Sequence, residues 1–338
     1  MATLKNRKPR MSRKAFSALF SFPEVAEHYS DAAATTVFHG DCMELLREIP
    51  EQAIDLVVTS PPYNLGKQYE TRLSLESYYD FQKIVIAECV RKLSPHGSIC
   101  WQVGNHVSNN HIVPLDILLF PIFTEIGLVL RNRIVWHFEH GLHCANRFSG
   151  RYETIMWFTR PGKEYTFELD RVRVPQKYPG KRYYKGPRAG QYSANPLGKN
   201  PADVWIIPNV KHNHVEKTDH PCQFPVELVE RLILALTNEG DLVVDPFMGV
   251  GTSLVAALMN RRRSAGADTV KSYVNIARKR IDKAHQGTLR VRPRNRPIYV
   301  PQGSITVAPW NRGESTHRSS VKPLSLDMPT AEKGPHGY

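Results

Sequence analysis

Four consecutive residues, Ser60-Pro61-Pro62-Tyr63, follow the apolar run 54–58 and could hold a flat group that carries an amine. Two adjacent prolines can continue neither a sheet ladder nor a helix, so the chain leaves the expected strand in a stiff conformation. The Ser60 hydroxyl and the Pro61 carbonyl can then accept hydrogen bonds, while the Tyr63 ring offers a stacking face. An exocyclic amine on a nucleobase suits these groups. Taken alone, however, such a motif is more often an ordinary proline-rich turn.

A second stretch, 241–252, has the pattern of a ligand-binding turn between a strand and a helix. Its apolar run ends in Asp245, and Gly249 and Gly251 precede the small apolar segment 253–259. This arrangement brings backbone close to a ligand at a helix N-terminus. No Gly-Lys-Ser/Thr follows, which excludes a phosphate-binding P-loop, and the third glycine of the dinucleotide fingerprint is missing. A nicotinamide oxidoreductase is therefore the weakest alternative.

Helix and strand patterns alternate along the chain, which predicts an α/β fold with a parallel-rich sheet. The segment 263–268 ends in Asp268, whose carboxylate can accept both hydroxyls of a ribose, about 20 residues after the glycines. The expected strands are 36–38, 54–58, 98–103, 128–136, 153–159, 241–245 and 263–268, and the expected helices are 43–49, 75–93, 225–237, 253–259 and 270–284.

The charge balance of the chain favours a polyanionic partner. There are 45 Lys and Arg against 32 Asp and Glu in 338 residues, and no strongly basic amphipathic helix stands out, so nucleic acid is favoured over a membrane surface. No run of about 18 apolar residues occurs, and none follows the basic N-terminus, so we expect a cytoplasmic protein without a membrane span. The five cysteines lack C-x-x-C spacing, which agrees with a reducing compartment.

Basic and aromatic residues are interleaved between the two motifs. Residues 161–199 contain nine Lys or Arg and three acids, with glycines and prolines that interrupt any long element. Such a surface can grip phosphates and reach base edges, although a solvated insertion is the plain alternative. We expect DNA contacts from Lys177, Lys181, Arg182, Tyr183, Lys185 and Arg188.

The two motifs together resemble the S-P-P-Y and D-P-F-x-G-x-G-T motifs of S-adenosylmethionine-dependent DNA amino-methyltransferases. The first motif precedes the second, which resembles the circularly permuted beta class of that family, and the likeness runs through much of residues 37–284. The resemblance implies a Rossmann-like class I methyltransferase fold, with a mixed, mostly parallel sheet and helices on both faces. It further implies that residues 161–200 are an irregular target-recognition insertion.

The resemblance also implies roles for individual residues. Asp268 departs from the family, which more often has Glu there, and Asp41 could equally be a helix N-cap. The segment 217–225 looks like the one that lines the methionine end of the cofactor pocket. The catalytic residues implied are Ser60, Pro61, Pro62 and Tyr63, and the residues implied for S-adenosyl-L-methionine binding are Asp41, Thr218, His220, Asp245, Phe247, Gly249, Gly251, Thr252 and Asp268.

The implied reaction methylates the amine of a base that has been rotated out of double-stranded DNA. Ser at the first motif position usually accompanies cytosine N4 in this family, so we expect cytosine N4, with adenine N6 as the alternative. Methylation of protein glutamine uses a similar motif that usually begins with Asn, and an RNA acceptor is a further alternative. The resemblance implies a functionally linked restriction endonuclease and is compatible with a homodimer.

Five segments are expected: a basic N-terminal arm (1–30), a catalytic half (31–160), the target-recognition region (161–200), a cofactor-binding half (201–286) and a basic, disordered tail (287–338). Two other sites are disfavoured. The histidine-rich stretch 137–144 matches no structural zinc spacing, and we expect no metal. Cys222 follows a proline, as in cytosine C5 methyltransferases, but covalent catalysis would make the Ser60 motif redundant.

Overall fold

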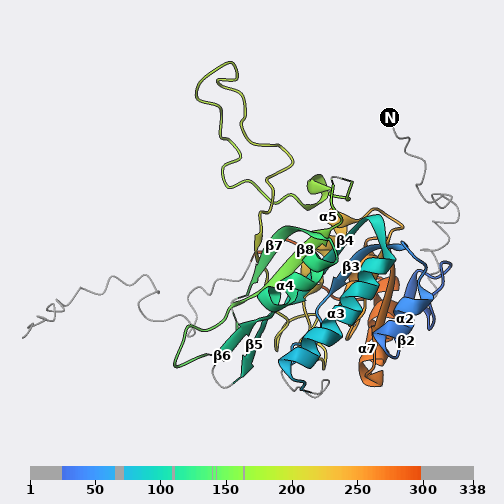
Figure 1. The fold of residues 1–338 in the computed structure, drawn as a ribbon. Coiled ribbons are helices and arrows are strands. Elements are labelled where there is room, and N and C mark those ends of the chain that lie inside the picture. Colours follow the sequence, from blue (N-terminus) through green and yellow to red (C-terminus); the bar gives the residue numbers. More distant parts are fainter. Residues whose placement is uncertain are drawn as a thin grey trace, which may run out of the picture. The chain divides into compact units, whose positions relative to one another are not determined.

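The computed structural model describes residues 25–64, 72–108, 111–138, 140–141, 143–162 and 164–297 (Figure 1). Every helix and strand named below belongs to one compact unit that ends at Arg296. Most of the predicted N-terminal arm, the loop 66–69 and residues 298–338 of the predicted tail lie outside the described residues.

The described strands form one nine-stranded sheet, in the order β1-β2-β11-β10-β3-β4-β8-β7-β9, and a separate hairpin of β5 and β6. Strand β8 is antiparallel to both neighbours, while every other pair in the large sheet is parallel. The bounds are β1 Val25–Ala26, β2 Thr35–His39, β3 Ile54–Thr59, β4 Leu93–Val103, β5 Asn105–Ser108, β6 His111–Pro114, β7 Val129–His137, β8 Tyr152–Thr159, β9 Val204–Ile206, β10 Leu242–Asp245 and β11 Arg263–Asp268.

The order of the strands confirms the predicted permuted, mixed and mostly parallel sheet. Strands β10 and β11 come last in the sequence, yet they lie between β2 and β3. The carboxyl ends of these four neighbouring strands therefore lie at the same edge. Ligands of open α/β sheets bind at this edge, where the direction of strand addition reverses.

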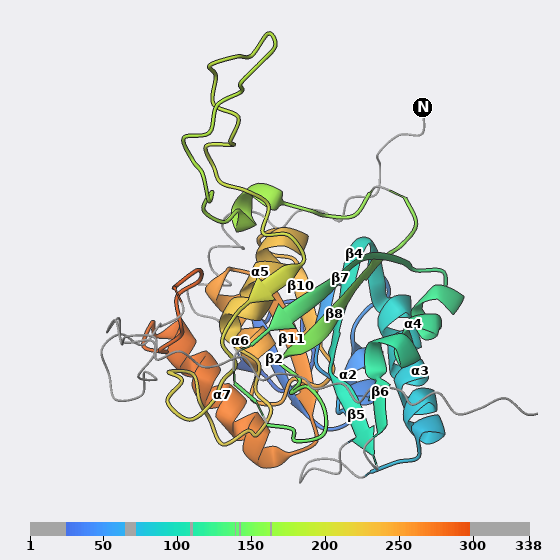
Figure 2. The same cartoon turned by 90° about the vertical axis from the view of Figure 1, so that its left-hand side faces the viewer.

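Helices cover both faces of the sheet, as predicted. One buried cluster contains apolar side chains of α2, α3 and α4, and a second contains those of α5, α6 and α7. Figure 2 shows α3 and α4 on one side of the sheet and α5, α6 and α7 on the other. The bounds are α2 Cys42–Glu48, α3 Leu75–Lys92, α4 Leu115–Glu125, α5 Val226–Leu236, α6 Thr252–Met259 and α7 Lys271–His285.

Some boundaries differ from the sequence predictions. Strand β4 begins at Leu93, five residues before the predicted start at Ser98, because α3 ends directly in the sheet and Leu93 pairs with Ile54. The three-residue strand β9 was not predicted, since its segment 204–206 is too short to show a period of two. It pairs in parallel with β7 at the sheet edge.

The insertion 161–200 has little regular structure. It contains the short 3₁₀ helix η1, Leu169–Val172, and the isolated bridges Val174↔Lys199 and Arg182↔Tyr192. Most of its residues beyond Val174 are exposed, and the yellow-green loop extends away from the sheet in both Figures 1 and 2.

The described residues after α7 pack against α5. The Arg292 guanidinium pairs with the carboxylate of the buried Glu227, and the Asn295 backbone N–H donates to the same side chain at 2.8 Å. The segment predicted as a tail from 287 therefore starts, up to Pro297, as a strap held by side-chain contacts.

Candidate active site

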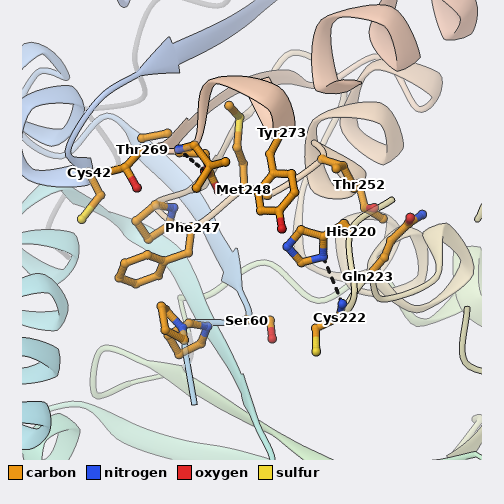
Figure 3. A pocket seen from close by; sticks show the side chains of 18 of the residues that line it. Cys42, Ser60, His220, Cys222, Gln223, Phe247, Met248, Thr252, Thr269 and Tyr273 are labelled. Carbon is orange, nitrogen blue, oxygen red and sulfur yellow. Dashed lines mark hydrogen bonds between the residues drawn. The ribbon is translucent and has the colours of Figure 1, made fainter. Parts of the chain in front are cut away.

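A cavity of about 200 Å³ opens where the carboxyl ends of β2, β11, β10 and β3 meet. It is the point at which the two sequence motifs come together, although they lie more than 180 residues apart. Of the predicted residues, its lining contains Asp41, Ser60, Pro61, Pro62, Tyr63, His220, Phe247, Gly249, Thr252 and Asp268. Figure 3 shows Ser60, Phe247, His220 and Tyr273 around this space.

The Ser60 motif is held rigidly at both ends. Before it, the hydroxyl of the buried Thr59 donates to Asp245 at 2.5 Å, which ties β3 to β10. After it, Asn64 has φ +58°, a left-handed conformation that Asn tolerates. The Asn64 amide donates to the Leu73 carbonyl at 2.8 Å and accepts from the Leu73 N–H at 2.6 Å. The prolines thus bridge two fixed points, and Ser60 and Tyr63 are presented to the cavity.

Tyr63 is half-buried, with its ring at the cavity and its hydroxyl directed inward. Its Oη lies 3.1 Å from Ser60 Oγ and accepts a hydrogen bond from Gln102 Nε2 at 2.6 Å. Burial raises the pKa of the Tyr63 phenol well above its ordinary value, so the hydroxyl keeps its proton at neutral pH. The ring is therefore fixed by its polar end while its face remains available for stacking.

The glycine turn requires both glycines. Gly249 has φ +52° and Gly251 has φ +72°, conformations that side chains rarely adopt. A Cβ on Gly249 would lie 3.3 Å from His220 Nε2, and one on Gly251 would lie 2.9 Å from the Cβ of Ala277. The turn therefore lets backbone approach the cavity on one side and helix α7 on the other.

A buried arginine supports this turn from below. Arg280 of α7 donates to the Val250 carbonyl at 2.7 Å and to Thr252 Oγ1 at 2.9 Å, and burial lowers its pKa to about 10. Arg280 was not identified from the sequence, because an arginine in a helix of mixed polarity gives no sign of pointing inward.

Two carboxylates at strand ends line the cavity. Asp268 ends β11, accepts from the Val270 N–H at 2.7 Å, and has its pKa raised to about 6 by burial. Asp41 caps α2 by accepting from the Met43 N–H at 2.7 Å while it also faces the cavity. The alternatives considered for Asp41, helix cap and ligand residue, are geometrically compatible.

Three predicted ligand residues shape the cavity without lining it. Asp245 is fully buried and accepts from Thr59, Ser253 and the Phe247 N–H, and burial raises its pKa to about 6. Gly251 turns the chain into α6. Thr218 accepts from the His220 N–H at 3.3 Å and donates to Gln223 at 2.8 Å, which sets the course of the segment that carries His220.

Several lining residues were not predicted, among them Phe81, Cys222, Gln223, Met248, Thr269 and Tyr273. Phe81 packs against Phe247, with ring centroids 5.9 Å apart, and Tyr273 packs edge-on against His220 at 4.6 Å. Their helices meet the cavity only in the folded sheet, so spacing along the sequence carried no signal for them.

The predicted DNA-contacting residues lie together on the insertion, outside the cavity lining. Several of its cations lie over neighbouring rings: Arg182 over Tyr192 at 4.1 Å, Arg188 over Tyr183 at 5.4 Å, and Lys177 over Tyr178 at 5.5 Å. The result is an exposed surface of guanidinium, ammonium and aromatic groups.

Two further site classes were searched for in the described part of the chain. No group of three or more His, Cys, Asp or Glu side chains there could hold a metal ion. Among the same residues, no helix is both long and apolar enough to cross a bilayer.

Comparison with known proteins gives a single family. Residues 54–279 match the N6/N4 methyltransferase family model, described as DNA methylase. The type II methyltransferase M.BglII of Bacillus subtilis is 50% identical over 242 residues, covering 71% of this chain and 67% of the relative. The DNA adenine methyltransferase YhdJ of Escherichia coli K12 is 31% identical over 255 residues, covering 74% and 84%.

A solved structure extends the likeness to the fold and the cofactor. The DNA modification methylase TTHA0409 of Thermus thermophilus, solved in complex with S-adenosyl-L-methionine, is 28% identical with a TM-score of 0.53, covering 74% of this chain and 95% of that one. The cavity described here fits such a cofactor: Asp268 can accept from ribose hydroxyls, the glycine turn admits close backbone approach, and Phe247 offers an aromatic wall. The chain therefore belongs to the S-adenosylmethionine-dependent N6/N4 DNA methyltransferase family, whose relatives include type II restriction–modification enzymes.

Proposed function

We propose that this protein transfers the methyl group of S-adenosylmethionine to the exocyclic N4 of a cytosine in double-stranded DNA. One observation carries the proposal: the amine-accepting groups of Ser60 and Pro61 line the same cavity as Gly249 and Asp268. A single cavity can therefore hold the methyl donor and the amine that receives the methyl.

The chain's own groups have distinct tasks in this reaction. Ser60 Oγ and the Pro61 carbonyl accept hydrogen bonds from the target amine, which orients its nitrogen, and the Tyr63 ring stacks on the base that has left the duplex. The cofactor supplies a methyl group already activated on a sulfonium. The protein thus contributes alignment and a fixed polar environment rather than a strong general base.

The remaining predicted residues hold and position the cofactor in this proposal. Asp268 accepts from the ribose, Asp41, Phe247, Gly249, His220 and Thr252 line its cavity, and Asp245, Gly251 and Thr218 fix the segments that do so. The six selected residues of the insertion, from Lys177 to Arg188, contact DNA and contribute to sequence recognition. Methylation at that sequence would protect DNA from a functionally linked restriction endonuclease.

The choice of cytosine rests on Ser60, since serine at this position usually accompanies cytosine N4. Adenine N6 is the second candidate, and one observation favours it: the E. coli relative is named a DNA adenine methyltransferase. A serine hydroxyl can accept from either amine, so the two candidates share the same chemistry at Ser60.

The proposal can be tested in cells. The protein and its Ser60→Ala variant are expressed in a bacterial host that lacks its own DNA methyltransferases, and the host DNA is sequenced by a method that detects modified bases. We expect N4-methylcytosine at one short sequence with the unaltered protein and a strong loss with the variant. N6-methyladenine at a defined sequence would select the second candidate, and unmodified DNA from cells with abundant folded protein would refute both.

A further inference from the structure

A carboxylate from a distant strand lies directly behind the Ser60 motif. Glu153 stands near the start of β8, and β8 is the reversed strand of the sheet, so its first residues lie at the edge where the parallel strands end. Tyr63 Oη donates to Glu153 Oε2 at 3.2 Å. A residue 90 positions away in the sequence thus contacts the catalytic motif.

Counting donors and acceptors fixes the direction of the hydrogen bonds in this cluster. The Gln102 amide N–H groups can only donate, and they point to Tyr63 Oη at 2.6 Å and to Glu153 Oε2. The one proton of the Tyr63 hydroxyl is directed to Glu153. The contact of 3.1 Å between Ser60 Oγ and Tyr63 Oη therefore needs the serine proton.

That assignment determines what Ser60 offers to the cavity. A hydroxyl has one proton and two lone pairs, and the proton of Ser60 is directed away from the cavity, toward Tyr63. Ser60 Oγ therefore meets a ligand as an acceptor only. An amine, which brings N–H groups, matches this oxygen, whereas a carbonyl at the same position of a base does not.

The packing around the cluster is close. A Cβ on Gly104, which follows β4, would lie 3.1 Å from Tyr63 Cε2 and 3.4 Å from Glu153 Cγ. Glycine at this position lets the tyrosine ring and the glutamate side chain lie against the backbone. Burial, and next the Glu153 charge, raise the pKa of Tyr63 well above its ordinary value, so the tyrosine remains a donor.

We propose that Glu153 is a positioning residue that acts through Tyr63: it fixes the hydrogen-bond direction so that Ser60 presents only lone pairs to the target amine. This inference rests on the proposed methyl transfer to an exocyclic amine. It adds that discrimination between amine-bearing and carbonyl-bearing pyrimidines is built into the protein two hydrogen bonds away from the base.

Replacement of Glu153 by glutamine allows the opposite direction. The new amide can donate to Tyr63 Oη, after which the tyrosine proton can turn to Ser60 and the serine proton can turn to the cavity. Because a misplaced group at the reacting centre costs a large part of the rate, we expect Glu153→Gln to lower kcat by roughly 100-fold. The affinity for S-adenosylhomocysteine should not change.

The experiment compares the unaltered enzyme with Glu153→Gln, Tyr63→Phe, the double variant, and the matched control Glu239→Gln. Glu239 is exposed and pairs with Arg261, away from the cavity lining. The measurements are kcat and KM on a duplex containing the mapped methylation site, calorimetric affinity for S-adenosylhomocysteine, and thermal melting. If Glu153 acts through Tyr63, its substitution adds almost nothing in the Tyr63→Phe background.

A binding measurement reports the hydrogen-bond direction itself. With S-adenosylhomocysteine present, the unaltered protein should bind a duplex with the target cytosine more tightly than one with deoxyuridine there, and Glu153→Gln should lose roughly tenfold of that preference. Fully additive losses in the double variant, or an unchanged preference for cytosine in Glu153→Gln, would refute the relay while methylation by the unaltered enzyme still stood. An unaltered enzyme that labels no DNA base would overturn both proposals.

Discussion

The contact between the glycine turn and α7 predicts a specific loss of stability. Gly251→Ala places a methyl group on a residue with φ +72°, where its Cβ would lie 2.9 Å from the Ala277 Cβ. The left-handed conformation costs an alanine roughly 1–2 kcal/mol. Overpacking of the kind forced here costs about 1–3 kcal/mol more. We therefore expect the free energy of unfolding to fall by about 2–5 kcal/mol.

Gly287→Ala is the matched control for this change. Gly287 has φ +68°, close to that of Gly251, but a Cβ there meets nothing within 4 Å. Both alanines restrict the unfolded chain equally, so that contribution cancels between the variants. The control should lose only the conformational part, and the difference between the two variants isolates the contact with Ala277.

Urea unfolding followed by circular dichroism measures both free energies, and calorimetry measures the affinity for S-adenosylhomocysteine. Gly251→Ala should also weaken cofactor binding, because Gly249 and Thr252 line the cavity on either side of it. Equal losses of stability in the two variants would show that the approach to α7 does not require the glycine, and would refute this reasoning.

Three further predictions concern the cavity and the insertion. Ribose hydroxyls favour ionised Asp268, whose pKa is about 6 before binding, so affinity for S-adenosylhomocysteine should be full above pH 6 and fall by up to about tenfold per pH unit below it. Calorimetry across this range should find the slope reduced in Asp268→Asn, which retains Asp245 with its similar pKa. Alkylation of the exposed Cys222, measured by peptide mass, should slow when S-adenosylhomocysteine fills the cavity, and equal rates would place the thiol outside it. Charge reversal on the insertion should weaken duplex binding and flatten its dependence on salt while leaving cofactor affinity unchanged, as checked by fluorescence anisotropy; the residues to reverse are Lys181, Arg182, Lys185 and Arg188.

The sequence was sufficient for the parts of the fold that local chemistry determines. The apolar run 54–58, the two prolines after it and the glycines near 250 each restrict the backbone on their own. The predicted α/β class and permuted strand order were confirmed for this reason. The stripe of Val226, Val229 and Ile233 also forms a buried helix face, as its spacing indicates.

The partners that come from other elements could not be predicted in the same way. Glu153 contacts Tyr63 only because β8 runs against its neighbours, a property that the short apolar pattern of a strand does not reveal. Arg280 and Phe81 reach the site from helix faces whose rotation is fixed by packing. Asp245 shows the converse, since a residue that lies in the motif is fully buried and holds two strands together.

The most direct test of the central claim identifies the atom that receives the methyl group. Purified protein is incubated with methyl-labelled S-adenosylmethionine and a duplex that carries the mapped site, and the DNA is digested to nucleosides whose masses and retention are compared with standards. We predict the label in N4-methylcytosine. Label in N6-methyladenine would keep an amine as the acceptor and overturn the choice of base from Ser60. Label in 5-methylcytosine would contradict the account, because a carbon acceptor does not use the hydrogen bonds that Ser60 and Pro61 offer.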